Sequence, residues 1–188
     1  MGEEFPSIYS RNFQRFIEKF RKNKIIEKKP LCRIILLGSY FPPEEKEFLL
    51  RLRDDLREDG FVNTWLVESY PTYNELGIRE KSIFCVEYSH INFFVITFEG
   101  AGRGETVELE HIINNASRLS FKTTVFYEVK YENDREVSSL SLLQEDGLIS
   151  TRTKMHKFTK DNYDELFQLM RAEAWNFHYH YVIREKKY

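Results

Sequence analysis

The stretch from Phe93 to Ile112, FFVITFEGAGRGETVELEHI, decides the fold class of this 188-residue chain. It opens with an apolar run, passes through glycines at 100, 102 and 104, and continues into a segment with Leu109 and Ile112 at helical spacing. An uninterrupted apolar run is typical of a strand that is covered on both faces, as in a parallel sheet. The stretch therefore predicts a strand, a glycine-rich loop and a helix, and the loop is either a tight connection or the edge of a site.

The rest of the chain repeats this alternation of strand and helix. With the strand just described, at 91–98, strands are predicted at residues 31–38, 61–67 and 123–129, and an edge strand at 150–158. Apolar residues at helical spacing recur before Gly60, at 78–88, and from Asn162 onward. Asn162 and Glu165 form an N-cap pair at the start of the last helix. The pattern predicts an α/β three-layer sandwich with a mostly parallel sheet of about five strands in flavodoxin-like order, with extra N- and C-terminal helices.

We expect a single domain over residues 1–188. Residues 1–30 would form an N-terminal helix, residues 31–129 the core strand–helix units, and residues 130–188 an edge strand and a long C-terminal helix. The polar segment YENDRE is predicted to be a loop, and SSLSLLQEDG a short helical turn. The aromatic residues of the last helix lead us to expect a homodimer.

Composition narrows the function classes. A net charge of −2 creates no overall field for nucleic acid or anionic membrane, so neither is an expected partner. The basic stretch 19–29 reads as the solvated face of the first helix, with a phosphate-binding strip as the alternative. Cys32 and Cys85 stand alone, so no metal or cofactor site is predicted, and buried free thiols suit a reducing, cytoplasmic location. The acidic N-terminus lacks the apolar run of a signal peptide.

In a doubly wound sheet the ligand crevice lies beyond the carboxyl ends of the strands. This rule selects the loops GSYFPP, after the first strand, and EGAGRGE, after the third. Gly102 and Gly104 would let the backbone approach a ligand at the N-terminus of the following helix. Glu108 falls at the margin of the apolar face of that helix, near its start. It is a candidate catalytic residue, although a carboxylate there also complements the helix dipole.

The order of these motifs resembles the nucleoside 2-deoxyribosyltransferase family over residues 31–129. That family has a Gly-x-aromatic stretch after its first strand, matched by Gly38, Ser39 and Tyr40, and a Gly-Thr-x-x-Glu-Leu-Gly signature after its third. Gly104 and Glu108 match the second motif, whereas Glu105 replaces its threonine, Gly102 its aspartate and Glu110 its final glycine. The family's acidic residue before the third strand falls on SHIN, so Ser89, His90 or Asn92 would take its place. The segment ELEHI is also similar to Toll/interleukin-receptor (TIR) domains.

Both resemblances imply attack on, or stabilisation of, an anomeric carbon by one carboxylate. The implied activity is cleavage or transfer of an N-glycosidic bond of a nucleoside, nucleotide or NAD-type substrate, with Glu108 as nucleophile or electrostatic stabiliser. The implied substrate contacts are Gly38, Ser39, Tyr40, Phe41, Ser89, Asn92, Gly102, Gly104 and Glu105. The alternative is a non-catalytic nucleotide-sensing or protein-interaction domain, TIR-like in role. A third hypothesis is a nucleic-acid-associated protein that uses residues 19–29 and the last helix.

Overall fold

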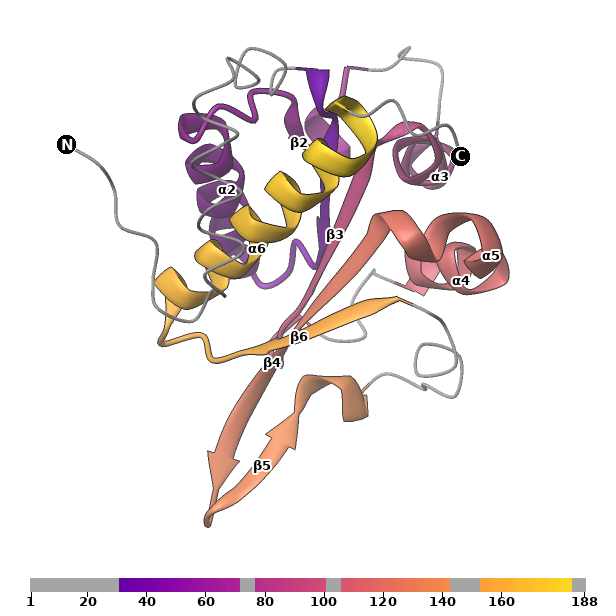
Figure 1. Ribbon diagram of the computed structural model, residues 1–188. Coiled ribbons are helices and arrows are strands. Elements are labelled where there is room, and N and C mark those ends of the chain that lie inside the picture. Colours follow the sequence, from indigo (N-terminus) through magenta and orange to yellow (C-terminus); the bar gives the residue numbers. More distant parts are fainter. Residues whose placement is uncertain (1–30, 72–76, 101–105, 143–152, 184–188) are drawn as a thin grey trace, which may run out of the picture.

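The computed structural model describes residues 31–71, 77–100, 106–142 and 153–183 (Figure 1). Within them the chain forms a six-stranded, mostly parallel sheet flanked by helices on both faces, which confirms the predicted α/β sandwich. The predicted N-terminal helix and the basic stretch 19–29 lie outside these residues.

The parallel strands have the predicted flavodoxin-like order. They are β1 (Ile34–Gly38), β2 (Thr64–Leu66), β3 (Ile91–Ile96), β4 (Thr123–Glu132) and β6 (Lys154–Phe158). β1 pairs with β2 on one side and β3 on the other, and β4 then pairs with β3 and β6. The direction of winding therefore reverses between β1 and β3, which is where a ligand crevice is expected.

β1 and β3 lie at the centre of the sheet because their sequences are apolar at nearly every position. All six residues of β3 are buried, and the first four residues of β1 are at most 2% exposed. Side chains alternate between the two faces of a strand, so both faces of this sheet need a helical cover. Ile34 and Leu36 of β1 accordingly join one core cluster, and Ile35 and Leu37 the other.

The helices divide between these faces. α2 (Pro43–Glu58) and α6 (Tyr163–Phe177) cover one face, while α3 (Ile78–Tyr88) and α4 (Thr106–Asn114) cover the other (Figure 1). The shorter helical elements are α5 (Ala116–Leu119), η2 (Val67–Ser69), η3 (Ser120–Lys122), η4 (Ser139–Leu142) and the π-helical η5 (His178–Ile183).

Two helix ends follow the sequence signals. Gly60 adopts a φ of 100° directly after the C-cap of α2, a left-handed conformation that glycine adopts at little cost. At the start of α6 the Asn162 side chain accepts a hydrogen bond from the Glu165 backbone N–H at 3.4 Å. The capping prediction for the last helix is therefore confirmed.

The predicted polar loop YENDRE is instead a β-hairpin. β4 continues through Glu132 and pairs in antiparallel fashion with β5 (Arg135–Ser138), so that the two strands project from the sheet as a ribbon (Figure 1). Asn133 and Asp134 have φ angles of 50° and 61°, the backbone of a tight two-residue hairpin turn. The polar composition of this segment indicated a loop, although Asn and Asp are residue types that favour a two-residue hairpin turn.

Candidate functional site

A pocket of about 370 Å³ opens beside the point where the strand order reverses. It lies among the end of β1, the loop that follows it, the start of η2, the first turns of α3, and α4. Its lining residues are Leu37, Gly38, Tyr40, Phe41, Val67, Glu68, Ile78, Arg79, Ser82 and Glu108. Four of the sequence-predicted site residues therefore come together: Gly38, Tyr40, Phe41 and Glu108.

Close packing of β1 against β3 defines the floor of the pocket. Gly38 pairs with Val95, and a Cβ atom on Gly38 would lie 2.8 Å from the Val95 carbonyl oxygen. A larger residue would force the two strands apart. The chain then turns at Ser39, whose hydroxyl donates to the Phe41 carbonyl at 2.8 Å and accepts from the Phe41 N–H at 3.2 Å. Ser39 thus shapes the loop and is not part of the pocket wall.

Glu108 is the less exposed of the two carboxylates that line this pocket. It lies in the first turn of α4, and its Oε1 accepts a hydrogen bond from the hydroxyl of Ser82 on α3. Its Oε2 is buried and has no hydrogen-bond partner among the described residues. A buried carboxylate oxygen without a donor is costly in free energy. Ser82 therefore holds one carboxylate oxygen, and the other has no donor among the described residues.

Two neighbouring acidic groups stay protonated near neutral pH. Burial raises the pKa of the Tyr40 hydroxyl well above its usual range; backbone N–H groups at Glu68 and Val67 oppose this, and the charge of Glu108 adds to it. Burial also raises the pKa of the Cys85 thiol to about 12, again with a contribution from Glu108. Tyr40 is thus a neutral hydrogen-bond donor beside the carboxylate.

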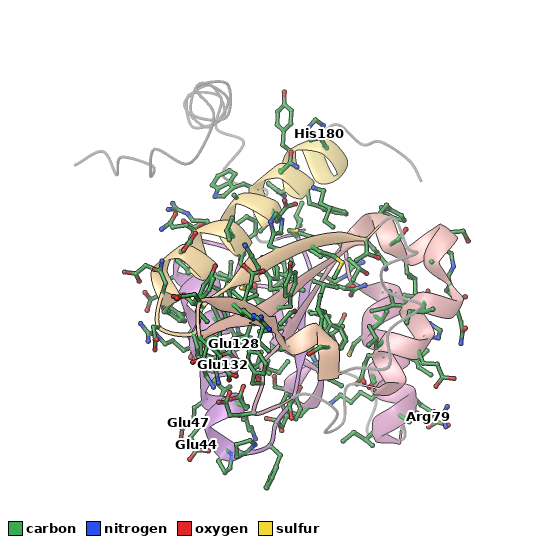
Figure 2. The ribbon with its side chains drawn as sticks, turned by 90° about the horizontal axis from the view of Figure 1, so that it is seen from below. Glu44, Glu47, Arg79, Glu128, Glu132 and His180 are labelled. Atoms are coloured by element: carbon green, nitrogen blue, oxygen red, sulfur yellow. The ribbon has the colours of Figure 1, made fainter. Side chains whose placement is uncertain are left out.

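The mouth of the pocket combines apolar surface with a cation. Phe41 and Ile78 expose 58% and 76% of their surface there. Arg79 follows Ile78 in the first turn of α3, is exposed, and extends outward at the edge of the view in Figure 2. On the opposite wall Glu68 pairs with Lys46 at 2.9 Å. An aromatic face and a guanidinium therefore stand at the entrance, above a buried carboxylate.

Ser89 and Asn92 do not line this pocket. Asn92 pairs with Ile35, whereas Gly38 pairs with Val95, so Asn92 lies about 10 Å back along the sheet toward its amino edge. The Ser89 hydroxyl donates to Asn92 Oδ1 at 2.5 Å, and the Asn92 amide donates to the Val86 carbonyl at 3.2 Å. These bonds tie the end of α3 to the start of β3.

Gly102, Gly104 and Glu105 lie outside the described residues. His111 follows Glu108 by one helical turn but contacts Glu87, with 2.7 Å between Nε2 and Oε1. Hydrogen bonds from Arg118 and His111 lower the pKa of Glu87 to about 2. His111 is thus part of a surface ion-pair group.

The sequence analysis missed Ser82, Arg79 and Glu68. Ser82 lies 26 residues before its partner Glu108, and the packing of α3 beside α4 brings the two together. Arg79 and Glu68 are charged residues among many in this chain, without a motif around them. The only local signal for Ser82 was its position on the same side of α3 as apolar residues such as Cys85, which indicates a buried serine.

The part of the chain that the structure describes contains no cluster of three or more His, Cys, Asp or Glu residues able to hold a metal ion. None of its helices is long and apolar enough to cross a membrane. Comparisons with protein-family models, with curated proteins and with solved structures found no match to this chain.

Proposed function

We propose that this protein cleaves or transfers the N-glycosidic bond of a nucleoside, nucleotide or NAD-type substrate, with Glu108 acting on the anomeric carbon. One observation carries the proposal: Glu108 Oε1 is held by Ser82, while Oε2 is buried at the pocket without a hydrogen-bond donor among the described residues. A carboxylate kept in this condition costs folding stability, as is typical of active sites.

The chemistry needs one negatively charged oxygen close to C1′. When the bond between C1′ and the base nitrogen breaks, its electron pair leaves with the base and positive charge develops on the sugar. Glu108 Oε2 either stabilises that charge or forms a bond to C1′, which water or a second base then breaks. The bond to Ser82 holds the carboxylate in one orientation throughout.

The pocket suits a nucleoside in size and lining. Its volume of about 370 Å³ lies within the range of small-molecule sites. Leu37 and Val67 supply apolar walls for a base, and the exposed ring of Phe41 can stack on it. Tyr40 can donate to a ring nitrogen or carbonyl of the departing base. Arg79 at the mouth is suited to a phosphate group through its planar set of donors.

The test is release of free base, followed by liquid chromatography, from nucleosides, deoxynucleosides, their monophosphates and NAD. Glu108→Gln keeps the size of the side chain and removes its charge, and Glu110→Gln is a matched control on the exposed side of the same helix. Turnover by the parent and by Glu110→Gln, but not by Glu108→Gln, is the expected result. Saturable nucleotide binding without turnover would reject the reaction and favour the nucleotide-sensing alternative.

A further inference from the structure

A second, larger pocket of about 580 Å³ lies beyond the carboxyl ends of β3 and β6, alongside the second half of β4. It is lined by Glu99, Glu128, Val129, Lys130, Tyr131, Glu132, Thr159, Lys160 and Asp161. In Figure 1 the arrow of β4 points downward, so Figure 2 looks onto this end of the sheet, with Glu128 and Glu132 labelled near its middle. None of these residues lines the Glu108 pocket, so this pocket is a separate feature.

Glu128 is the most deeply buried carboxylate of this pocket. Its side chain is 1% exposed, and its Oε2 accepts a hydrogen bond from the Phe98 N–H at 2.9 Å. Its Oε1 is buried and has no hydrogen-bond partner among the described residues. Lys130 Nζ lies 3.6 Å from that oxygen, beyond hydrogen-bond distance, and donates to Glu99 at 3.0 Å. Burial raises the pKa of Glu128, as expected for a carboxylate short of donors.

The charges around the pocket favour a cation. Four carboxylates line it, from Glu99, Glu128, Glu132 and Asp161, against two ammonium groups. Both ammonium groups are already paired: Lys130 with Glu99 and, at 3.6 Å, with Glu128, and Lys160 with Glu99 and with the buried carboxylate of Glu45. The lining therefore keeps an excess of negative charge after its internal pairs are counted.

The cation must bring its own hydrogen-bond donors. A metal ion does not fit, because none of the described residues form a group of three or more carboxylate, thiolate or imidazole ligands. A guanidinium binds best to two oxygens of one carboxylate, and Glu128 offers a single free oxygen. An ammonium group directs three donors outward and can bridge single oxygens from different side chains.

We infer that this pocket binds an aliphatic diamine or polyamine, with one ammonium group donating to Glu128 Oε1. The methylene chain then runs outward along β4 toward Glu132, which lies on the same face of the strand as Glu128. A second ammonium group reaches the exposed carboxylates of Glu132 and Asp161 at the rim. This inference is independent of the reaction proposed for Glu108.

Isothermal titration of the full chain with 1,4-diaminobutane and with spermidine tests it, with 1-aminobutane and Mg²⁺ as comparison ligands. We expect saturable binding that weakens about tenfold or more in Glu128→Gln, because the amide presents a donor where the ammonium needs an acceptor. The surface variant Glu110→Gln removes the same charge at a distance and should leave the affinity unchanged. Glu132→Gln, at an exposed position, should weaken the diamine more than the monoamine.

Three results would overturn the inference. They are no saturable binding of either amine, equal loss of affinity in Glu128→Gln and Glu110→Gln, and competition by Mg²⁺ as strong as that by the diamine. The last two would show general attraction of cations to an acidic surface. Thermal unfolding of each variant without ligand verifies that the fold is kept, and Glu132→Gln provides a site-specific test even if Glu128→Gln does not fold.

Discussion

Replacing Ser82 with alanine should destabilise the protein, whereas replacing Glu108 with glutamine should not. Ser82 is 3% exposed and donates to Glu108 Oε1. Loss of a hydrogen bond to a charged group costs about 1.5–3 kcal/mol. Alanine returns about 0.5 kcal/mol because it favours the helix more than serine does. We therefore expect a loss of roughly 1–2.5 kcal/mol for Ser82→Ala, or a fall in Tm of about 2–10 °C for a chain of this length.

Glu108→Gln should be neutral or stabilise the fold by up to about 2 kcal/mol, because it removes a half-buried charge whose Oε2 has no hydrogen-bond donor among the described residues. In Glu108→Gln the bond that remains to Ser82 is between neutral groups, so adding Ser82→Ala to that variant should cost about 1 kcal/mol less than it does in the parent. Urea unfolding of the four proteins measures this cycle. A neutral Ser82→Ala, or a Glu108→Gln that destabilises the fold, would refute the geometry of the pair.

Further predictions concern charge, pH and packing. Lys160→Met removes the cationic partner of Glu45, which is 3% exposed, and should cost about 1–3 kcal/mol in urea unfolding. Lys157→Met breaks only an exposed pair and should lower stability less than Lys160→Met does; equal losses would contradict this. Burial lowers the pKa of His90 to about 4 from 6.5, and its Nδ1 accepts the Arg33 N–H at 3.0 Å. Because the folded state resists protonation, stability should fall as pH drops from 6.5 toward 4, by at most about 1.4 kcal/mol per pH unit, and His90→Gln should flatten this slope. Gly100→Ala would place a Cβ 2.7 Å from Ser39 Cβ and should cost about 1–3 kcal/mol by thermal unfolding; an unchanged Tm would show that the loop relaxes.

The fold could be predicted because its strongest signals are local and continuous. The apolar runs of β1 and β3 fix a parallel sheet, and the helix bounded by Ile78 and Tyr88 agrees at both ends with the prediction. The hairpin of β4 and β5 was not predicted, because the first two residues of β5, Arg135 and Glu136, are charged and exposed. No alternation of polar and apolar residues therefore marks the strand. β2 proved shorter than its apolar run, because only Thr64–Leu66 pair with β1.

The site could be predicted in part for a related reason. Glu108 and Tyr40 follow parallel strands, and the topology rule places such loops together whatever their distance in sequence. Ser82 could not be found in this way, because its contact with Glu108 depends on how α3 packs beside α4. The resemblance grouped Ser89 and Asn92 with the site, whereas the structure places them at the amino edge of β3, away from the pocket. The expected homodimer and cytoplasmic location stay predictions.

The most direct test of the central claim is the ratio of kcat/KM for base release between the parent and Glu108→Gln, on the substrate that the panel identifies. The proposal predicts a fall of about 10²-fold or more, located in kcat, because the carboxylate acts mainly when charge develops on the sugar. The affinity for substrate should change little. An activity within about threefold of the parent, in a folded variant that binds substrate, would contradict the assignment of Glu108 as the group that acts on the anomeric carbon.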